Sequence, residues 1–560
     1  MYSSKKIVQS LGQILKAKSI FNIIISPGSR NAPIIIHFTQ QKEFKTYSIV
    51  DERCAAFFAL GIAQQINKPV VMNCTSGSAV VNCYPAIIEA FYQSIPLILV
   101  TADRPKEIIN IFEGQSIYQE NIFQRHVASS VQLTEDESKS GIWYNDRLIN
   151  ESINKCILTN KPIHINIPFS EPLYDTTDHL QVAPKIIKIM PVQNYIETYN
   201  YKKEQHIWRK YEKKMILLGM YSPEQNMEII LRKLSLDPSI VIFTETTSHV
   251  HGKFFFSSID QLIFNMNTKK WISLKPHILL TIGINIISKK IKFLLRKYPP
   301  IYHWHIGLSN DIYPDTYYKL TTYWPINPGL FFKIFDNYNK NKISNYRKKW
   351  ETLKNEKIKK HKFFLKKENS FSDLKVLFIV FKAIPNYTIL QLGNSMIIRY
   401  YQLFDQKKCS VKSYCNRGVS GIDGCVSTAI GSSVMIKKTV TLIVGDISFF
   451  YDSNALWNSY VPNNFRIILI NNGGGNIFRF ISEKKFSEKT FNFFETKHIF
   501  SAKKICEMYN WKYEEVSDQY ALKKSLSFFW KKTNKPFLLE INTKKYDNAK
   551  ILKKYLSYLF

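Results

Sequence analysis

A chain of 560 residues is too long for a single hydrophobic core and has the length of about three domains of ordinary size. Hydrophobic residues make up 45% of it, which excludes a disordered polymer, and no apolar run approaches the roughly 18 residues that a membrane span needs. The net charge of +33 comes from basic residues spread along the whole chain, which predicts a surface that attracts small anionic substrates rather than a nucleic-acid site.

Residues 1–182 are predicted to form a first domain in which buried strands alternate with helices. Four short apolar runs have the length and composition of strands, at residues 23–25, 70–73, 95–100 and 163–167. Polar turns rich in Gly, Pro, Ser or Thr end the first three of these runs. Continuous apolar strands separated by helices indicate a parallel sheet that is covered on both faces.

Two further regions repeat this pattern. The expected strands of the middle domain (183–345) are residues 215–220, 240–245, 277–283 and 301–307, and those of the last domain (346–560) are residues 388–395, 441–446, 466–472 and 536–542. The lysine-rich block at residues 339–369 is predicted to be a helical or flexible connector. The predicted fold class is therefore α/β, with three open, mostly parallel-sheet domains and helices on both faces.

The first and last domains resemble each other in their turns. Each opens with a strand that ends in a Gly-Ser or Gly-Asn-Ser turn (IIISPGS and ILQLGNS). Each continues with a turn of cysteine, glycine and polar residues into a helix of small residues (CTSGSAVVN and CNRGVSGIDG). Two related open sheets on either side of a third predict a ligand between the outer pair, at the C-terminal ends of the strands.

Asp446 and Asn472 carry the strongest chemical signal in the sequence. Each follows an apolar strand, and their separation of 472 − 446 = 26 positions suits one strand–helix–strand unit. Their side-chain oxygens are therefore expected at neighbouring strand ends, where with a backbone carbonyl they form a hard-oxygen site for magnesium. Nearby glycines let backbone N–H groups approach a diphosphate. Either motif alone is better explained by a helix N-cap or an Asn-Gly turn; the pair at this spacing favours the metal site.

This pair resembles the metal–diphosphate motif of thiamine-diphosphate-dependent enzymes. Within that superfamily the chain is similar to the 2-succinyl-5-enolpyruvyl-6-hydroxy-3-cyclohexene-1-carboxylate synthases of menaquinone biosynthesis. The resemblance covers both outer domains in order, whereas the middle domain matches only in its strand pattern and in ISKKI at residues 287–291. The blocks that carry it are SPGSRNAP (26–33), DERCAAFFALG (51–61), TSGSAVVNCYPAIIEA (75–90), TADRP (101–105), GQSIYQ (114–119), IPFSEPLY (167–174), GNSMIIR (393–399), NRGVSGIDG (416–424) and NNGGGNIF (471–478).

The resemblance implies thiamine diphosphate as the cofactor, bound together with Mg²⁺ or Mn²⁺. It makes Glu52 the carboxylate that hydrogen-bonds the aminopyrimidine ring and so assists proton removal from the thiazolium carbon. An acid at this position also suits a helix dipole, but Asp51 fills that role as well as Glu52 does. Ile447 replaces the last glycine of the generic GDG triplet, and an apolar residue there is usual in this subfamily. The remaining implied cofactor residues are Ser395, Ile422, Asp446, Ile447, Asn472, Gly474 and Ile477, of which Asp446, Asn472 and Gly474 bind the metal.

Four arginines point to the substrate: Arg30, Arg104, Arg399 and Arg417 lie at predicted strand ends or in the helices that follow. Guanidinium groups bind carboxylates through two hydrogen bonds and stay charged when partly buried, so four in one cleft predict a polyanionic substrate. By the resemblance, the substrates are 2-oxoglutarate, which is decarboxylated, and isochorismate, to which the succinyl-semialdehyde unit is added. The resemblance adds Ser29, Gln115, Lys289, Lys290 and Ser395 to the substrate-binding residues, and it makes Glu52, Gln115 and the four arginines the catalytic set.

The resemblance also implies a homodimer, or a tetramer of two dimers, with active sites at the subunit interface. The eight scattered cysteines and the absence of a secretory apolar block near the N-terminus favour a cytoplasmic protein. Two alternatives stay open: another thiamine-diphosphate 2-oxoacid decarboxylase or carboligase of the acetolactate-synthase type, and a basic binding protein without catalysis. The arginine set favours the synthase over a decarboxylase of small monoacids. Glu52, Asp446 and Asn472 together argue against the binding protein.

Overall fold

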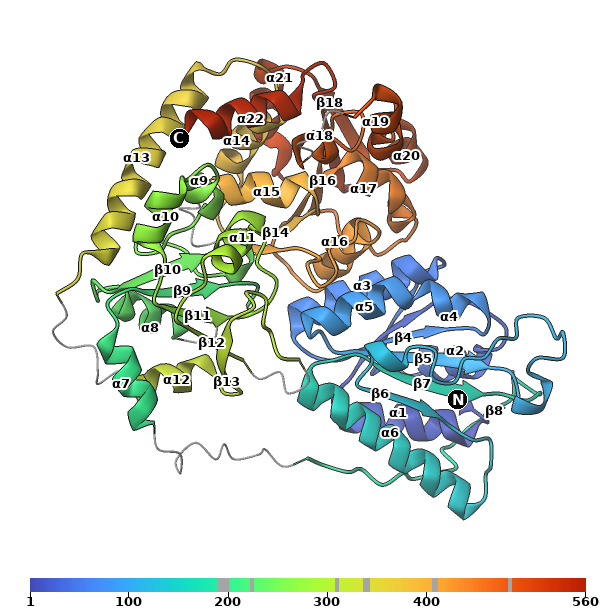
Figure 1. Ribbon diagram of the computed structural model, residues 1–560. Helices are drawn as coiled ribbons and strands as arrows, with labels where there is room; N and C mark the ends of the chain where they lie inside the picture. The colour runs from blue at the N-terminus through green and yellow to red at the C-terminus, as the bar shows by residue number, and fades with distance from the viewer. Residues whose placement is uncertain (190–200, 222–225, 308–311, 336–342, 405–410, 482–485) are drawn as a thin grey trace.

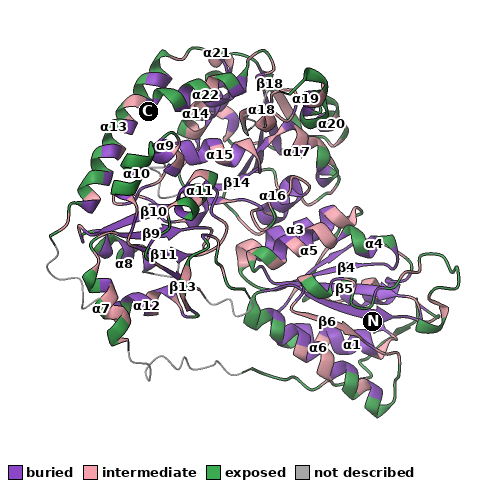
Figure 2. Ribbon diagram, viewed as in Figure 1, coloured by how far each residue is buried: buried purple, intermediate pink, exposed green. Residues whose placement is uncertain are grey.

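Three large open sheets, each with helices packed on both faces, form the centres of three domains (Figure 1). The computed structural model describes all residues except 190–200, 222–225, 308–311, 336–342, 405–410 and 482–485. Neighbouring strands of the three large sheets run parallel, and their side chains are largely buried between the helical layers (Figure 2). The predicted α/β class is therefore confirmed. In the described part of the chain, no helix combines the length and the apolar character that a bilayer span requires.

The first domain consists, in chain order, of β1 (Tyr2–Ser3), α1 (Lys6–Ala17), β2 (Asn22–Ile25), α2 (Ala32–Thr39), β3 (Lys45–Ser48), α3 (Glu52–Ile66), β4 (Val70–Cys74), α4 (Ser78–Asn82), α5 (Tyr84–Gln93), β5 (Leu97–Asp103), β6 (Ser129–Gln132), α6 (Lys139–Thr159), β7 (Ile163–Pro168) and β8 (Thr176–Thr177). Its large sheet has the order β3-β2-β4-β5-β7-β6. Side chains alternate along each strand, so Ile23 and Ile25 pack with α1 and α6, whereas Ile24 packs with α3 and α5.

The middle domain consists of α7 (Lys202–Lys210), β9 (Lys214–Leu218), α8 (Met227–Leu234), β10 (Ile240–Thr244), α9 (Ile259–Ile263), α10 (Thr268–Leu274), β11 (Ile278–Ile282), α11 (Lys289–Lys297), β12 (Tyr302–Ile306), β13 (Leu320–Trp324) and α12 (Pro328–Phe335). Its sheet has the order β10-β9-β11-β12-β13. Helices again cover both faces, because Ile216 and Leu218 belong to one buried cluster and Met215 and Leu217 to another.

The last domain consists of α13 (Tyr346–Lys367), α14 (Asp373–Ala383), β14 (Ile389–Leu392), α15 (Met396–Leu403), β15 (Lys412–Tyr414), α16 (Cys425–Val434), β16 (Val440–Gly445), α17 (Asp446–Tyr451), β17 (Phe465–Asn471), α18 (Ile477–Ile481), α19 (Glu488–Glu495), α20 (Lys503–Met508), β18 (Lys512–Val516), α21 (Gln519–Phe529), β19 (Phe537–Asn542) and α22 (Asn548–Tyr558). Its sheet has the order β15-β14-β16-β17-β19-β18. Numbered from its own first strand, this is the same order as in the first domain, 2-1-3-4-6-5. The predicted kinship of the two outer domains is therefore confirmed at the level of topology.

Every strand predicted from an apolar run is present, but strands at the sheet edges were missed. The missed strands of the three large sheets, β3, β6, β13, β15 and β18, all lie at a sheet edge, and the two-residue strands β1 and β8, which pair only with each other, were missed as well. An edge strand has one unpaired side and is only partly covered, so it does not need a continuous apolar run. The sequences KTYS in β3 and KYEEV in β18 illustrate this, with half-buried and exposed positions along most of their length.

The predicted connector is helical where the structure describes it, as α13; residues 339–342 lie outside the described residues. The first half of α13 packs on the middle domain through Trp350 and Leu353. Its second half packs on the last domain through Phe364 and Leu365. The connector therefore holds these two domains against each other. The domain boundaries at residues 182/183 and 345/346 stay predictions.

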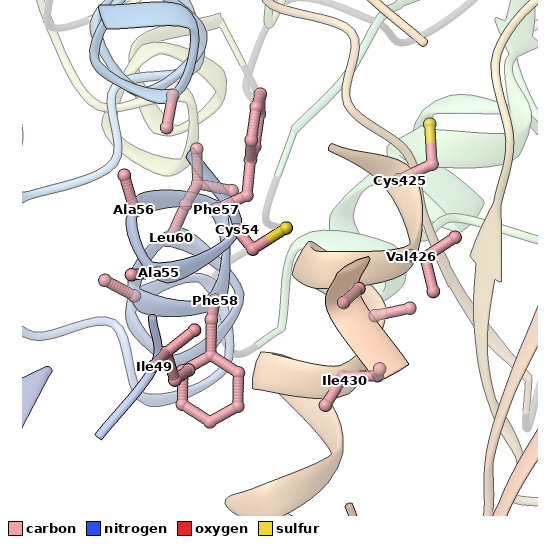
Figure 3. Close-up of a cluster of buried hydrophobic side chains, with 14 of the residues drawn as sticks. Ile49, Cys54, Ala55, Ala56, Phe57, Phe58, Leu60, Cys425, Val426 and Ile430 are labelled. Carbon is pink, nitrogen blue, oxygen red and sulfur yellow. The ribbon is translucent and has the colours of Figure 1, made fainter. Parts of the chain in front are cut away.

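The first and last domains meet through helices α3 and α16, whose backbones approach closely (Figure 3). A Cβ on Gly61 would lie 2.1 Å from the carbonyl oxygen of Thr428, and a Cβ on Gly431 would lie 2.1 Å from that of Phe58. Because both glycines lack a side chain, the two backbones pack directly on each other. Around this contact one buried cluster contains side chains of both domains, among them Cys54, Ala55, Phe57, Leu60, Val426 and Ile430.

Replacing Gly61 with alanine tests this contact. Alanine gains up to about 1 kcal/mol over glycine in helix propensity, whereas inserting an atom into a packed contact typically costs about 1–3 kcal/mol. We therefore expect Gly61→Ala to lower the unfolding temperature measured by calorimetry. Gln65→Ala, at a half-buried position of the same helix, is the control and should leave that temperature nearly unchanged. A Gly61→Ala protein as stable as the wild type would contradict the close approach of α3 and α16.

Candidate active site

The ends of two neighbouring strands carry the predicted metal motif. Strand β16 pairs in parallel with β17, so Asp446 and Asn472, which follow these strands, lie side by side as their spacing predicts. Asp446 Oδ2 accepts hydrogen bonds from the backbone N–H groups of Gly473 at 2.8 Å and Gly474 at 3.0 Å. Its Oδ1 accepts one from Ile447 N–H at 2.8 Å. The carboxylate is thereby held against the turn of Gly473 and Gly474.

The side-chain amide of Asn472 has an arrangement that suits a cation beside Asp446. Its Nδ2 donates to Asp373 Oδ2 at 2.8 Å, while its Oδ1 is buried without a hydrogen-bond partner among the described residues. A buried polar atom without a partner is costly, and a cation satisfies an oxygen of this kind. Gly474 has a φ of +147°, and a Cβ there would lie 2.7 Å from the carbonyl oxygen of Glu495, so a side chain does not fit. A carboxylate, an amide oxygen and a backbone carbonyl together suit Mg²⁺ or Mn²⁺.

Glu52 is the first residue of helix α3 and belongs to the first domain, whereas the metal motif belongs to the last domain. Asp51 is the N-cap, since its Oδ1 accepts the N–H of Cys54 at 3.1 Å. Glu52 is therefore not needed as a cap, as the sequence indicated. Glu52 is half-buried, and its carboxylate accepts a hydrogen bond from Asn82 Nδ2 at 3.2 Å. The buried apolar cluster includes Cys54, two residues later in the same helix. The capping argument made from the sequence is confirmed.

The loop that carries Ile422 lies between Glu52 and the metal motif. Arg53, the residue after Glu52, donates from Nη1 to the carbonyl of Asp423 at 2.7 Å. The carbonyl of Ile422 accepts a hydrogen bond from Ser448 Oγ at 2.9 Å, two residues beyond Asp446. The loop is thus tied on one side to α3 and on the other to α17. Both hydrogen bonds connect residues of the same chain.

Ser395, Ile447 and Ile477 follow strands β14, β16 and β17, at the same edge of the last sheet. Ser395 precedes α15 with a left-handed φ of +66°. The neighbouring Asn394 donates from Nδ2 to the carbonyls of Asn416 and Gly421, each at 2.6 Å. The turn of Ser395 is therefore fastened to the loop that carries Ile422. Ile477 is the first residue of α18, which follows the glycine turn.

The four predicted substrate arginines lie as two pairs, one in each outer domain. Burial lowers the pKa of Arg30, and the positive charge of Arg104 lowers it further. Burial likewise lowers the pKa of Arg399, and Arg417 adds to the effect. The Nε atoms of all four are buried without a hydrogen-bond partner among the described residues. Paired cations with unused donors suit an anionic ligand. That both pairs face one cleft stays a prediction.

The smaller substrate residues lie at these pairs or on the middle domain. Ser29 directly precedes Arg30, and Gln115 follows Gly114, whose carbonyl accepts a hydrogen bond from Arg104 Nη2 at 2.9 Å. Lys289 and Lys290 begin helix α11, where Lys289 is exposed and Lys290 is half-buried, with its ammonium 5.5 Å from the ring centre of Phe293. A role of these two lysines in substrate binding stays a prediction.

The structure adds a cation that the sequence did not single out. Burial lowers the pKa of Lys292 on α11, and this lysine interacts with the charges of Glu245, Arg417 and Arg399. Glu245 is fully buried at the end of β10 and accepts the N–H groups of Ile287 and Ser288. Burial raises its pKa to about 7. Neither residue belongs to a motif, and a lysine within a lysine-rich helix carries no signal of its own.

Asp373 and His498 are two further neighbours of the metal motif that were missed. Asp373 is the first residue of α14, and an acid there reads as an ordinary first-turn residue. His498 lies with its Nε2 3.2 Å from Asp446 Oδ2 and stacks on Phe500. Burial raises the pKa of Asp446, whereas backbone donors and His498 oppose the rise. Nothing in the local sequence around either residue indicates these contacts.

Two models of known protein families match the outer domains. Residues 5–129 match the family model "Thiamine pyrophosphate enzyme, N-terminal TPP binding domain", and residues 394–541 match "Thiamine pyrophosphate enzyme, C-terminal TPP binding domain". Thiamine pyrophosphate is another name for thiamine diphosphate. The two matches fall on the two outer domains, with Glu52 in the first and Asp446 and Asn472 in the second. They support thiamine diphosphate as the cofactor.

Curated relatives extend the similarity to the whole chain. A 2-succinyl-5-enolpyruvyl-6-hydroxy-3-cyclohexene-1-carboxylate synthase of Flavobacterium johnsoniae is 44% identical over 565 residues, covering 100% of both chains. Synthases of the same name from Christiangramia forsetii and Porphyromonas gingivalis are 43% and 34% identical and cover 100% of this chain, with 99% and 98% of their own lengths matched. The chain therefore belongs to the 2-succinyl-5-enolpyruvyl-6-hydroxy-3-cyclohexene-1-carboxylate synthase family of thiamine-diphosphate-dependent enzymes.

Proposed function

We propose that the chain decarboxylates 2-oxoglutarate and joins the resulting succinyl-semialdehyde unit to isochorismate by conjugate addition. The product is 2-succinyl-5-enolpyruvyl-6-hydroxy-3-cyclohexene-1-carboxylate, an intermediate of menaquinone biosynthesis. The observation that carries the proposal is the pair of arginines in each cofactor-binding domain, with four buried Nε donors lacking partners among the described residues. The two substrates bring four carboxylates, which such guanidinium groups bind. Full-length relatives that bear the synthase name support the same reaction.

Residues of both outer domains bind the cofactor. When bound, thiamine diphosphate supplies the carbon nucleophile and the electron sink that decarboxylation of a 2-oxo acid requires. Glu52 hydrogen-bonds the aminopyrimidine ring and holds a proton there, while Ile422 supports the cofactor between the two domains. Asp446, Asn472 and the carbonyl of Gly474 hold Mg²⁺ or Mn²⁺ against the diphosphate. Ser395, Ile447 and Ile477 line the same edge of the last sheet.

The arginines bind and orient the substrates. Two dianionic molecules repel each other, and the repulsion is strong where water is excluded, so cations must neutralise them before the reacting carbons can meet. Arg30 with Arg104 and Arg399 with Arg417 supply this charge, and Lys289 and Lys290 add to it from the middle domain. Ser29, Gln115 and Ser395 contribute neutral hydrogen bonds that fix the position of the bound carboxylates.

We also propose that the chain acts as a homodimer with its active sites between subunits, as the resemblance implies. Phe493 and Ile499 of the last domain expose most of their side chains, and large exposed apolar groups favour a protein partner such as a second copy. Within the single chain, however, Arg53 already contacts the loop of Ile422. Helix α3 and the loop of Ile422 can therefore form a site within one chain or between two chains. The two arrangements differ in whether mixing two inactive variants restores activity.

The reaction is tested by one assay on purified protein with thiamine diphosphate, Mg²⁺ and 2-oxoglutarate, with and without isochorismate. We expect carbon dioxide release that is coupled to loss of isochorismate. Release that is independent of isochorismate would identify a simple decarboxylase instead. No release by protein that binds the cofactor would reject 2-oxoglutarate as the donor.

Arg104→Ala is expected to weaken binding of a carboxylate substrate. Hydrogen bonds to charged groups are worth about 1.5–3 kcal/mol, so KM for one substrate should rise on the order of 10- to 100-fold. The affinity for thiamine diphosphate, measured by calorimetry, should not change. Arg147→Ala, which removes a half-buried arginine of the first domain that pairs with Glu151, is the control. A fall in unfolding temperature with Arg104→Ala alone would make Arg104 a structural residue.

Glu52→Gln is expected to abolish turnover while preserving the fold. Glutamine keeps the shape of the side chain but cannot hold the proton, and loss of such a group typically costs on the order of 100- to 10,000-fold in rate. The unfolding temperature should match that of the wild type, because Asp51 and not Glu52 caps α3. Activity near the wild-type level would remove Glu52 from the proposed mechanism.

Mixed assemblies of Glu52→Gln and Asp446→Ala chains distinguish the two arrangements of the site. If each site takes Glu52 from one chain and Asp446 from the other, a mixed dimer contains one intact site. Mixing two inactive variants, with unfolding and refolding to exchange chains, should then restore part of the activity. If both residues act within one chain, every site keeps one defect and no activity returns, which would contradict the interface proposal.

A further inference from the structure

Asp373 is a buried carboxylate directly beside the proposed metal site. It is the first residue of α14, with 2% of its surface exposed. Its Oδ2 accepts the Nδ2 of Asn472 at 2.8 Å, and its Oδ1 accepts the hydroxyl of Thr543 at 2.5 Å. Its backbone N–H donates to Asn548 Oδ1 at 2.8 Å. Both carboxylate oxygens are thus engaged, and the group is held from three directions.

This contact decides which end of the Asn472 amide faces the metal motif. An amide side chain has a donor end and an acceptor end of nearly equal size, whereas an ionised carboxylate only accepts. With Nδ2 bound to Asp373, Oδ1 is directed elsewhere, and it is the atom that is buried without a partner among the described residues. A turned amide would place its oxygen against the carboxylate of Asp373. Only the observed orientation presents an oxygen to a cation.

The negative charge of Asp373 also acts on the proposed metal site. Asp373 and Asp446 interact electrostatically, which means that two buried carboxylates lie near each other beside the glycine turn. Two such charges repel in the absence of a cation and attract one when it is present. Asp446 is a direct ligand in the proposed site. Asp373 reaches that site through the amide of Asn472.

We propose that Asp373 is a positioning residue for the metal site: it orients the Asn472 amide with Oδ1 toward the cation and adds negative charge behind it. This inference rests on the proposed function only in assuming that Asp446, Asn472 and Gly474 hold a divalent cation with the diphosphate. Partners of this kind behind metal ligands typically change metal affinity about 10- to 100-fold. A purely structural role, that of fastening α14 to the end of β19 through Thr543, is the competing explanation.

The test measures Mn²⁺ affinity by the electron paramagnetic resonance signal of free Mn²⁺, on full-length protein saturated with thiamine diphosphate. The measurements are made at pH 8. Asp373→Ala is expected to weaken Mn²⁺ binding on the order of 10- to 100-fold. Thr543→Val, which removes the other partner of the same carboxylate, is the matched control and should retain the wild-type affinity within roughly threefold.

An exchange of the two side chains provides a test that does not depend on the alanine variant folding well. Asp373→Asn alone lets the amide of residue 472 turn either way and removes the charge, so Mn²⁺ binding should weaken. In Asp373→Asn combined with Asn472→Asp, the new amide donates to the new carboxylate, whose other oxygen is free for the metal. Total charge is unchanged from the wild type. The double variant is therefore expected to bind Mn²⁺ more tightly than Asp373→Asn alone.

Three results would overturn the inference. Wild-type Mn²⁺ affinity in Asp373→Ala is the first, and equal losses in Asp373→Ala and Thr543→Val are the second, since they would show that Asp373 only anchors α14. A double variant no better than Asp373→Asn is the third. If the proposed metal site itself were wrong, the wild-type protein would bind no Mn²⁺ in the presence of thiamine diphosphate. This result is distinct from the three results above, in which the wild-type protein binds Mn²⁺.

Discussion

The close contact between α3 and α16 is the constraint on which the arrangement of the two outer domains depends. Gly61 and Gly431 let the two helix backbones touch, so the first and last domains share one buried cluster. Glu52 begins one of these helices, and the loop of Ile422 leads into the other. Because both segments are attached directly to the packed helices, the packing fixes how they lie relative to each other within one chain. Both segments are therefore positioned by rigid elements and not by long loops.

Some of the buried polar atoms without hydrogen-bond partners lie where ligands are proposed to bind. The buried Oδ1 of Asn472 and the buried Nε atoms of four arginines lack partners among the described residues. An interior rarely leaves such groups unpaired without a reason, because each costs free energy unless a ligand, an ion or water completes it. The oxygen lies beside Asp446, where a cation is expected, and the guanidinium groups suit carboxylates.

Much of the fold could be predicted from sequence patterns, and the failures have a common cause. Interior strands such as β5 and β17 are buried on both faces, so they show continuous apolar runs. Edge strands such as β3 and β18 are partly exposed and lack that signal. For the site, Asp446 and Asn472 were predictable because neighbouring parallel strands end at the same edge. Asp373 was not, because it lies 99 positions before its partner Asn472 and belongs to no motif.

By itself, the amino-acid sequence determined the α/β class, the kinship of the outer domains, and the motifs that place the chain in its family. These depend on local patterns of apolar residues, glycines and acids, which act within one strand–helix–strand unit. Only the tertiary structure decided how the arginines pair and which way the amide of Asn472 faces. Such features depend on hydrogen bonds and charges between residues far apart in the chain, as in the contact between Asp373 and Asn472, and no local pattern encodes the direction of a hydrogen bond.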